Sequence, residues 1–325
     1  MFMAISLYSK VQLMNEVVAS GEHDASLHAP TWTQSWELIM PVEGTGICSG
    51  ISAVEFKDKI YAFFITEKTP NNLQLSHLVF SKGTDKALIV ERQEDFSING
   101  LTRHRPSVTV HDGHLFCFHT VRDQTVHYHV YSGTEWSHGG TVPGVLTDQA
   151  PSAVSYKDTL YLALQGTYNG EFYHKAFQNF EWGDTINSPG LHIKGSPSLC
   201  QFGDTLSVAF TGLDDGMHLF NFFSGKWEFI YKSPHYKVSG SPALYARNNY
   251  LVCASLAQAD QHVLTETLLE RTGSAPSLDV TTHLDRTVGT YLSEPCLIEY
   301  KDRFYLIGRR PCNDVGISLF KTSIR

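Results

Sequence analysis

The stretch Pro197-Ser-Leu-Cys-Gln-Phe-Gly-Asp-Thr-Leu-Ser207 decides the fold prediction, because its pattern recurs along the chain. An apolar run follows the Pro-Ser pair, a polar turn follows an aromatic residue, and a second apolar run comes next. Five further copies share this pattern, one of them with isoleucine at the proline position: Ile51, Pro106, Pro151, Pro242 and Pro295. Successive copies are 55, 45, 46, 45 and 53 residues apart. Six units therefore account for nearly all of the chain after residue 31.

The tryptophans occupy one place in this repeat. Four of them lie 15 residues before the start of a copy: Trp36, Trp136, Trp182 and Trp227. The fifth, Trp32, belongs to the same segment as Trp36. Glu91 and Val280 stand at the equivalent place of the other two units. The common spacing predicts one shared role for the tryptophans.

Each unit is predicted to fold into four short strands. Asp and Gly turns bound four apolar runs in the unit that starts at Pro197: Ser198–Phe202, Leu206–Thr211, Met217–Phe222 and Trp227–Tyr231. Four strands in about 45 residues, repeated around a ring, are typical of β-propeller blades. The sequence therefore predicts an all-β, six-bladed β-propeller with four antiparallel strands per blade.

The two ends of the chain suggest how such a ring is closed. The last unit ends with Val315–Ile324, which fits a third strand and leaves no fourth. The segment Trp32–Met40 resembles the fourth-strand text of the unit at Pro197. We therefore expect an N-terminal strand to close the ring, so that 32–325 form one propeller domain. Residues 1–31 form an extension, in which Ile5–Leu13 is an added strand or an oligomer contact.

The composition is that of a globular chain and limits its partners. Hydrophobic residues make up 42% and charged residues 18%, so intrinsic disorder is excluded. The formal net charge of −8 argues against nucleic-acid binding, and no apolar run is long enough for a membrane span. Residues 1–20 lack the pattern of a secretory signal, so we expect cytoplasmic synthesis and, for any release, a non-classical route.

The six cysteines are spread along the chain without a CxxC pair, and most lie in apolar runs: Cys48, Cys117, Cys200, Cys253, Cys296 and Cys312. Such a distribution in a long chain predicts free, buried thiols.

One face of the predicted propeller repeats polar side chains. Antiparallel order places the connection between second and third strands on the same face as the connection between units. Hydrogen-bonding side chains recur in the first of these connections: Asp123, Asn169, Asp214, Asp215, Asp260, Asn313 and Asp314. We expect this face to repeat a polar acceptor together with a nearby tryptophan. A tryptophan ring that covers a sugar, with oxygens that accept hydrogen bonds from its hydroxyls, would suit carbohydrate binding. Two structural alternatives stay open, because Asp and Asn stabilise tight turns and tryptophan in an outer strand can join neighbouring blades.

The unit at Pro197 resembles a known lectin repeat. Its segments Gly195–Leu199, Asp204–Gly212, Asp215-Gly216 and Gly225-Lys-Trp227 are similar to the blade repeat of bacterial propeller lectins of the Photorhabdus type. This resemblance implies fucose-type sugar binding in several shallow pockets between adjacent blades. It departs from that family in blade number, since those lectins have seven blades and six units are counted here.

An enzyme is the main alternative with a chemical basis. Residues just before each copy should surround the mouth of a central channel: Arg103, His104, Arg105, Asp148, Gln149, Lys194, Ser239, Ser293 and Glu294. Asp148 and Glu294 could serve as acid and base of a glycoside hydrolase, with Arg105 on an anionic group. The chain has no sialidase-type Ser-x-Asp-x-Gly-x-Thr-Trp motif. His127 and His129 share one strand face and would need a third ligand to hold zinc.

The sequence therefore predicts a non-enzymatic, multivalent carbohydrate-binding lectin whose partners are glycans or glycoconjugates. The predicted ligand-binding residues are Trp36, Trp136, Trp182, Trp227, Asp123, Asn169, Asp215 and Asp260. No cofactor, metal or catalytic residue is predicted, and homo-oligomerisation is left open. The alternatives are a protein-interaction scaffold and, behind it, a glycoside hydrolase.

Overall fold

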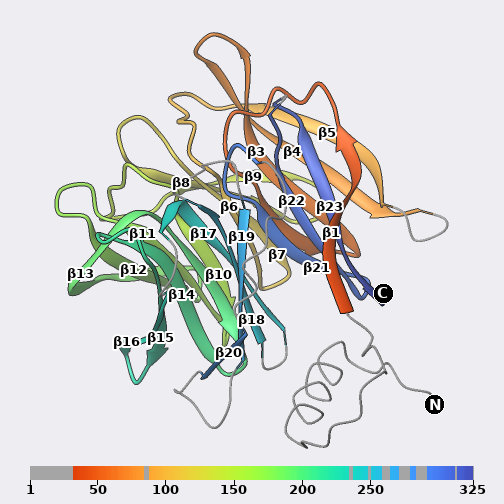
Figure 1. Ribbon diagram of the computed structural model, residues 1–325. Helices are drawn as coiled ribbons and strands as arrows, with labels where there is room; N and C mark the ends of the chain where they lie inside the picture. The colour runs from red at the N-terminus through yellow and green to blue at the C-terminus, as the bar shows by residue number, and fades with distance from the viewer. Residues whose placement is uncertain are drawn as a thin grey trace, which may run out of the picture. The chain divides into compact units, whose positions relative to one another are not determined.

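The computed structural model describes residues 32–83, 88–233, 237–247, 250–257, 264–270, 279–282, 291–311 and 313–324. Every regular element in these ranges is a β-strand, which confirms the predicted all-β class (Figure 1). The predicted extension, residues 1–31, lies outside the described part of the chain. Ser35–Lys321 form one compact unit, and the side-chain contacts and sites below lie within it.

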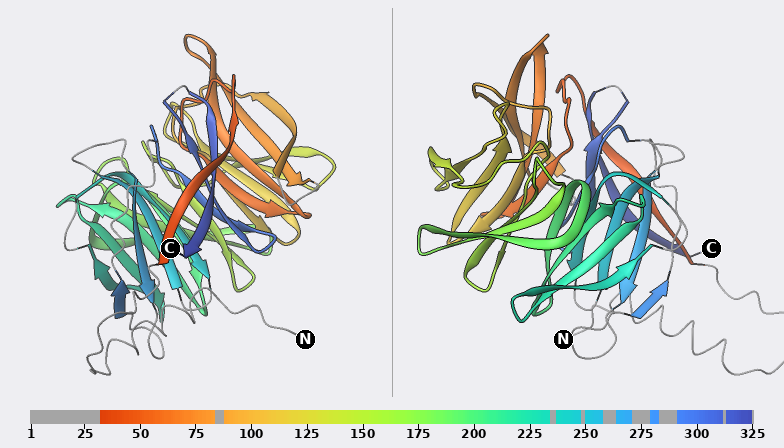
Figure 2. Two further views of the ribbon diagram at one scale, coloured as in Figure 1. Left: turned by 45° about the vertical axis from the view of Figure 1, so that its right-hand side comes forward. Right: turned by 90° about the vertical axis from the view of Figure 1, so that its left-hand side faces the viewer.

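The described strands form five sheets. Three sheets of four strands follow chain order: β2 (Ser52–Phe56), β3 (Lys59–Thr69), β4 (Asn72–Lys82) and β5 (Leu88–Ser97); β6 (Ser107–His111), β7 (His114–Thr120), β8 (Val126–Tyr131) and β9 (Trp136–Thr141); β17 (Val238–Arg247), β18 (Tyr250–Ala257), β19 (Leu264–Glu270) and β20 (Asp279–Thr282). A fourth has the order β1 (Trp32–Val42), β23 (Val315–Ile324), β22 (Arg303–Arg309) and β21 (Cys296–Tyr300). Figure 2 shows β1, in red, beside the blue β23.

The fifth sheet has seven strands: β10 (Ser152–Tyr156), β11 (Thr159–Gln165), β12 (Glu171–Gln178), β13 (Glu181–Phe202), β14 (Thr205–Gly212), β15 (Met217–Phe223) and β16 (Lys226–Lys232). The first part of β13 pairs with β12, and its last part pairs with β14. The sheet therefore consists of two four-stranded groups that share one strand.

Three of the four strands predicted for the unit at Pro197 are confirmed to within one residue at each end, and they correspond to β14, β15 and β16. The remaining one, Ser198–Phe202, is the end of the longer strand β13 rather than a separate strand. The difference arises because the backbone of 187–195, within the connection between the two units, stays extended.

Tight turns between first and second strands fix the register of three of the hairpins. Lys157 and Asp158 have φ of +47° and +58°, the left-handed values required by a two-residue type I′ turn. The same geometry recurs at Lys57-Asp58 and Lys301-Asp302. Pairing of Tyr156 with Thr159 then begins the β10–β11 ladder directly beside its turn.

First strands of successive groups are joined by one repeated hydrogen bond. In five of the six copies, the residue after the start of the copy accepts, through its side chain, a backbone N–H of the next first strand. The bonds are Val108 N to Ser52 Oγ (3.1 Å), Ala153 N to Ser107 Oγ (2.8 Å), Leu199 N to Ser152 Oγ (2.9 Å), Leu244 N to Ser198 Oγ (3.3 Å) and Ala53 N to Cys296 Sγ (3.2 Å). The last of these brings β21 against β2, although they lie at opposite ends of the described chain.

The apolar core is divided among the seams between neighbouring groups. In the described residues there are six buried apolar clusters, each drawn from two neighbouring four-stranded groups. Phe64 of β3 and Ile307 of β22, for example, belong to the same cluster and are fully buried. Burial of apolar area at every seam supplies the main stabilising free energy of such a stack.

Candidate functional site

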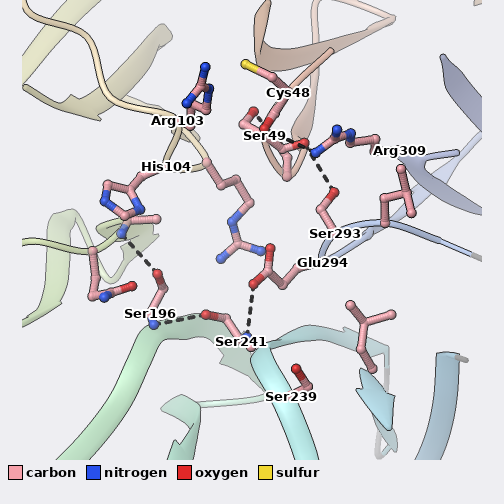
Figure 3. A pocket seen from close by; sticks show the side chains of 17 residues that line it. Cys48, Ser49, Arg103, His104, Ser196, Ser239, Ser241, Ser293, Glu294 and Arg309 are labelled. Atoms are coloured by element: carbon pink, nitrogen blue, oxygen red, sulfur yellow. Dashed lines mark hydrogen bonds between the residues drawn. The ribbon is translucent and has the colours of Figure 1, made fainter. Parts of the chain in front are cut away.

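A polar pocket of about 340 Å³ lies where the first strands begin (Figure 3). Its lining includes seven of the residues predicted to surround a channel mouth: Arg103, His104, Arg105, Gln149, Ser239, Ser293 and Glu294. The convergence of these residues on one cavity is therefore confirmed. Asp148 and Lys194, predicted for the same mouth, are not among its lining residues in the described chain. We call this cavity the arginine pocket, because Arg309 joins Arg103 and Arg105 in its lining.

The three guanidinium groups of the arginine pocket have different partners. Arg103 donates to Glu67 Oε1 at 2.5 Å, and this hydrogen bond is the main reason why its pKa is raised. Arg309 donates to Asn313 Oδ1 at 2.6 Å and to the Cys48 carbonyl at 3.2 Å, both neutral acceptors. Burial lowers the pKa of Arg309, and the positive charge of Arg103 adds to this effect. Excess positive charge is thus concentrated in the pocket wall.

One carboxylate, Glu294, faces this group of arginines. Its Oε1 accepts the backbone N–H of Ser241 at 3.2 Å. A Cβ atom at Gly240 would lie 2.6 Å from Oε1, and one at Gly50 would lie 3.0 Å from Oε2. The carboxylate therefore lies directly against the backbone at both positions. Gly240 also has φ +75°, which disfavours other residues.

His104 is a neutral group in the same wall. Burial lowers its pKa, and the opposing effect of the carboxylates of Asp148 and Glu294 is smaller. His104 therefore carries no charge at neutral pH, so the arginines provide the positive charge of the pocket.

The face that carries the connections between second and third strands is called the loop face below. Its predicted acceptors Asp123 and Asn169 stabilise the turns in which they lie. Asp123 Oδ1 accepts the backbone N–H of Thr125 at 3.1 Å and its hydroxyl at 2.6 Å, and these two bonds lower the pKa of Asp123. Asn169 Oδ1 likewise accepts the N–H of Glu171 at 3.0 Å. This is the turn-forming role that was kept as an alternative for these residues.

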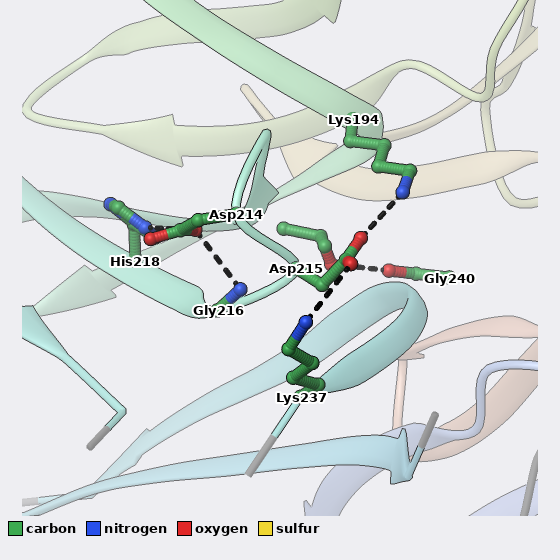
Figure 4. Close-up of polar contacts among 8 residues, drawn as sticks. Lys194, Asp214, Asp215, Gly216, His218, Lys237 and Gly240 are labelled. Atoms are coloured by element: carbon green, nitrogen blue, oxygen red, sulfur yellow. Dashed lines mark hydrogen bonds and ion pairs between the residues drawn. The ribbon is translucent and has the colours of Figure 1, made fainter. Parts of the chain in front are cut away.

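Asp215 lies in a charged cluster between two neighbouring groups (Figure 4). Its carboxylate is 2.5 Å from Lys194 Nζ and 3.8 Å from Lys237 Nζ. The adjacent Asp214 pairs with His218 at 2.9 Å and with Lys232, so its pKa is lowered. Asp260, the fourth predicted acceptor, lies outside the described residues.

The predicted tryptophans pack between neighbouring groups. Trp136 of β9 contacts Phe63 and Phe96 of the preceding sheet, with ring centroids 5.6 Å away in both cases. Trp182 packs in the same way on Phe118 and Tyr128 of the sheet before it.

Trp227 completes this set with a polar contact. Its Nε1 donates to His174 Nδ1 at 3.2 Å, and its ring lies edge-on to Phe172 at 5.3 Å. These contacts are those of residues that join neighbouring blades. Trp36 lies in β1, and its side chain is outside the described part of the structure.

Tryptophans and acceptors of one repeat lie at opposite ends of a strand, contrary to the expectation that they share a face. Trp136 follows the turn after β8, whereas Asp123 lies in the turn before β8. At about 3.3 Å per residue, the six residues of β8 separate the two backbones by roughly 17 Å. The expectation was wrong because the tryptophan begins the fourth strand, which starts at the end of the sheet opposite the loop face. We call that end the turn end.

An exposed aromatic residue that the sequence analysis did not select lies on the loop face. Tyr168 is 87% exposed, next to Asn169 in the β11–β12 connection. Below it, Glu171 Oε2 accepts from Asn169 Nδ2 at 2.6 Å and from Asn187 Nδ2 at 2.8 Å. The available signal was local: Tyr168 stands between Gly166 and Gly170, in a short polar connection where an aromatic ring has no core to enter.

Three further predictions concern thiols, metals and membranes. The described cysteines are all free, as predicted, but only three of them are buried (Cys117, Cys200 and Cys253), whereas Cys48 and Cys296 are partly exposed. No set of three or more His, Cys, Asp and Glu side chains in the described ranges is arranged to hold a metal ion. Among the described residues, there is no helix with the length and hydropathy needed to cross a membrane.

Solved structures resemble this chain over most of its length. The SapL1 lectin in complex with α-methyl fucoside has a TM-score of 0.62 at 11% identity, covering 86% of this chain and 96% of its own. The Aleuria aurantia lectin, described with a six-bladed β-propeller fold and a fucose recognition mode, has a TM-score of 0.57 at 9% identity, covering 87% and 96%. The fold is that of a β-propeller.

An enzyme also shares this propeller architecture. The Trypanosoma rangeli sialidase in complex with sialic acid has a TM-score of 0.54 at 10% identity, covering 90% of this chain and 59% of its own. At such identities the likeness concerns the fold alone. No protein-family model matches the propeller chain, and no curated protein matches its sequence.

Proposed function

We propose that the protein is a non-enzymatic lectin that binds fucose-type sugars of glycans at several shallow sites. The observation that carries this proposal is the likeness over at least 86% of the chain to two solved lectins, one in complex with a fucoside and one described by its fucose recognition. The Photorhabdus-type repeat of the unit at Pro197 supports the same sugar class. Weak single sites gain strength together when they bind one glycan-bearing surface.

The proposal includes a ring of six blades closed by the N-terminal strand. Six apolar seams, each between two neighbouring groups, support six blades. The hydrogen bond from Ala53 to Cys296 supports closure between the first and last units. The position of β1 beside β23 supports its role as the outer strand of the last blade.

The loop face is where we place the sugar sites. In the β11–β12 connection, the exposed ring of Tyr168 can cover the apolar face of a sugar. The amides of Asn169 and Asn187 and the carboxylate of Glu171 can bond vicinal hydroxyls. Asp123 and Asp215 provide carboxylates at the equivalent places of two other units, whereas Trp136, Trp182 and Trp227 join the blades.

A glycan array with matched variants tests this proposal. Wild-type protein should give saturable signals on fucosylated glycans, and Tyr168→Ala should weaken them about tenfold, since stacking on an aromatic ring is worth roughly 1–1.5 kcal/mol. Phe180→Ala is the control, because Phe180 is 82% exposed at the other end of β12. Equal losses in both variants would contradict the loop-face site. A silent array, with a protein partner recovered instead, would favour the scaffold alternative.

A glycoside hydrolase is the second candidate, favoured by Glu294 in the arginine pocket and by the sialidase likeness. Glycosidases need two carboxyl groups across the scissile bond, and Asp148 is not in the lining that the structure describes. Release of a chromophore from aryl glycosides, lost in Glu294→Gln, would establish this candidate. Absence of release across a panel of neutral and acidic aryl glycosides would leave the lectin.

A further inference from the structure

The arginine pocket has the charge of an anion site. Its lining contains three arginines and one carboxylate. Glu67 neutralises Arg103 from outside this lining, so Arg105 and Arg309 stand against Glu294 alone. Within the described residues, Arg309 is bound only through neutral oxygens, and Arg105 makes no hydrogen bond or ion pair. A guanidinium fork without a carboxylate partner is suited to an oxyanion from solution.

The opposite wall of the same cavity can donate to hydroxyl oxygens. Ser196 Oγ accepts the N–H of Ala150 at 3.0 Å, and Ser241 Oγ accepts the N–H of Ser196 at 2.9 Å. Both serines are buried, and because their hydroxyl oxygens act here as acceptors, each O–H group can still donate a hydrogen bond to a ligand. Figure 3 shows Ser196, Ser239 and Ser241 along the edge of the cavity away from Arg103 and Arg309.

The size of the cavity limits what it can take. At about 340 Å³ it lies at the lower end of the range for small-molecule sites. Its lining is mainly polar, with Leu256 and Leu292 as its largest apolar members. These features suit a small, hydroxylated molecule with one negative group better than an apolar ligand.

We propose that the arginine pocket is a second binding site that takes an acidic monosaccharide. The carboxylate or sulfate of the sugar binds Arg105 and Arg309, and its hydroxyls bind Ser196, Ser241 and Glu294. The site is separate from the loop-face sites, because Asp123, Asn169 and Asp215 are not among its lining residues. Because the proposed ligands of the two sites differ in charge, an experiment can disprove one site and still support the other.

The test is a ligand-observed NMR titration with sugar pairs that differ in one group. Glucuronate is compared with glucose, and galactose 6-sulfate with galactose, at low and high salt. We expect binding of one or both acidic sugars, no binding of their neutral partners, and a loss of affinity with added salt. Binding of the neutral partners with equal affinity would overturn the proposal, and so would no binding of either acid. Inorganic sulfate that binds as tightly as galactose 6-sulfate would overturn the role of the hydroxyls.

Two variants and a control assign the binding to this pocket. Arg105→Gln should lower the affinity at least about tenfold, as expected for a lost charge-assisted hydrogen bond. Glu294→Gln should raise it several-fold, because it removes the one opposing charge and keeps an acceptor for Ser241. Arg122→Gln is the control, since Arg122 is exposed on the β7–β8 connection outside the pocket. Equal losses in Arg105→Gln and Arg122→Gln would overturn the site. Fucose binding should be unchanged in Arg105→Gln.

Discussion

The two ends of the blades differ in what their side chains do. At the turn end, Trp136, Trp182 and Trp227 begin their segments of the outer strands and insert between neighbouring groups. At the loop end, Asp123 and Asn169 hold short polar turns, and the arginine pocket opens beside the first strands. The comparison teaches that blade assembly and the proposed ligand sites are assigned to opposite ends of the same strands.

The physical reason lies in the different demands of the two ends. Large aromatic rings give the greatest burial per residue, so they are placed where two sheets must be held together. Connections at the other end have no such partner and contain residues that satisfy their own backbone. Substitutions at the turn end should therefore change stability, whereas substitutions at the loop end should change binding.

The largest effect is expected at a seam. Trp227→Ala removes a ring packed on Phe172 and a hydrogen bond to His174, and should lower the free energy of unfolding by about 3 kcal/mol. Phe229→Ala in the same strand is the control, because Phe229 is 55% exposed and should change stability by less than about 1 kcal/mol. Urea denaturation measures both. Similar values for the two variants would contradict the role of Trp227 in holding this seam together.

An intermediate effect is expected from acid in the sheet β6–β9. His119 is buried beside His127 and His129, with ring centroids 5.9 and 5.4 Å away. Burial lowers the pKa of His119 to about 3 and that of His129 to about 4, with repulsion between the histidines as a smaller cause. Because both folded-state values lie below the unfolded value near 6.5, the stability is fully present above that pH and is lost as the pH falls towards 4 and 3.

Denaturation at pH 7 and pH 4 measures this effect. From pH 7 to pH 4, we expect the free energy of unfolding of the wild type to fall by on the order of 2 kcal/mol more than that of a His119→Leu variant. His114→Gln is the matched control, since His114 lies in the same strand and is accessible to solvent. A His119→Leu variant with the same acid sensitivity as wild type would show that His119 is not the cause.

The smallest effect is expected between first strands. Ser152→Ala removes the hydroxyl that accepts the N–H of Leu199 and should cost about 1 kcal/mol. Ser137→Ala, at an exposed position of β9, should cost less than about 0.5 kcal/mol. The unit at Pro242 offers a natural comparison, since it has Ala243 at this position. Thermal unfolding that ranks the exposed variant as the more harmful would refute the role of the inter-strand bond.

Much of the fold was predictable because its determinants are local and repeated. The strand Leu206–Thr211, for example, was predicted from an apolar run between Asp and Gly turns, and β14 (Thr205–Gly212) matches it closely. The length of β13 was not predictable, because the sequence Ser188-Pro-Gly190 is typical of a loop and only pairing with β12 and β14 keeps it extended.

The candidate sites were predictable in part. Arg105, Ser239 and Glu294 each lie just before the start of a copy, and this position was enough to predict that they come together. The reason is that six equivalent strand starts meet at one cavity. Local pattern could not tell whether Trp182 faces solvent or a neighbouring sheet, because an outer strand has both sides available. It also did not show that Tyr168 is exposed, which depends on the absence of packing around one connection.

The sequence by itself determined the strand content, the six repeats and the residues at the strand starts, because spacing and turn chemistry act over a few residues. Only the tertiary structure decided which side chains meet: it placed the tryptophans in seams, brought Ala53 to Cys296, and gathered Arg105 and Arg309 with Glu294 in one cavity. Such contacts depend on how successive sheets are stacked, and stacking is set by burial across the whole chain rather than by any one repeat.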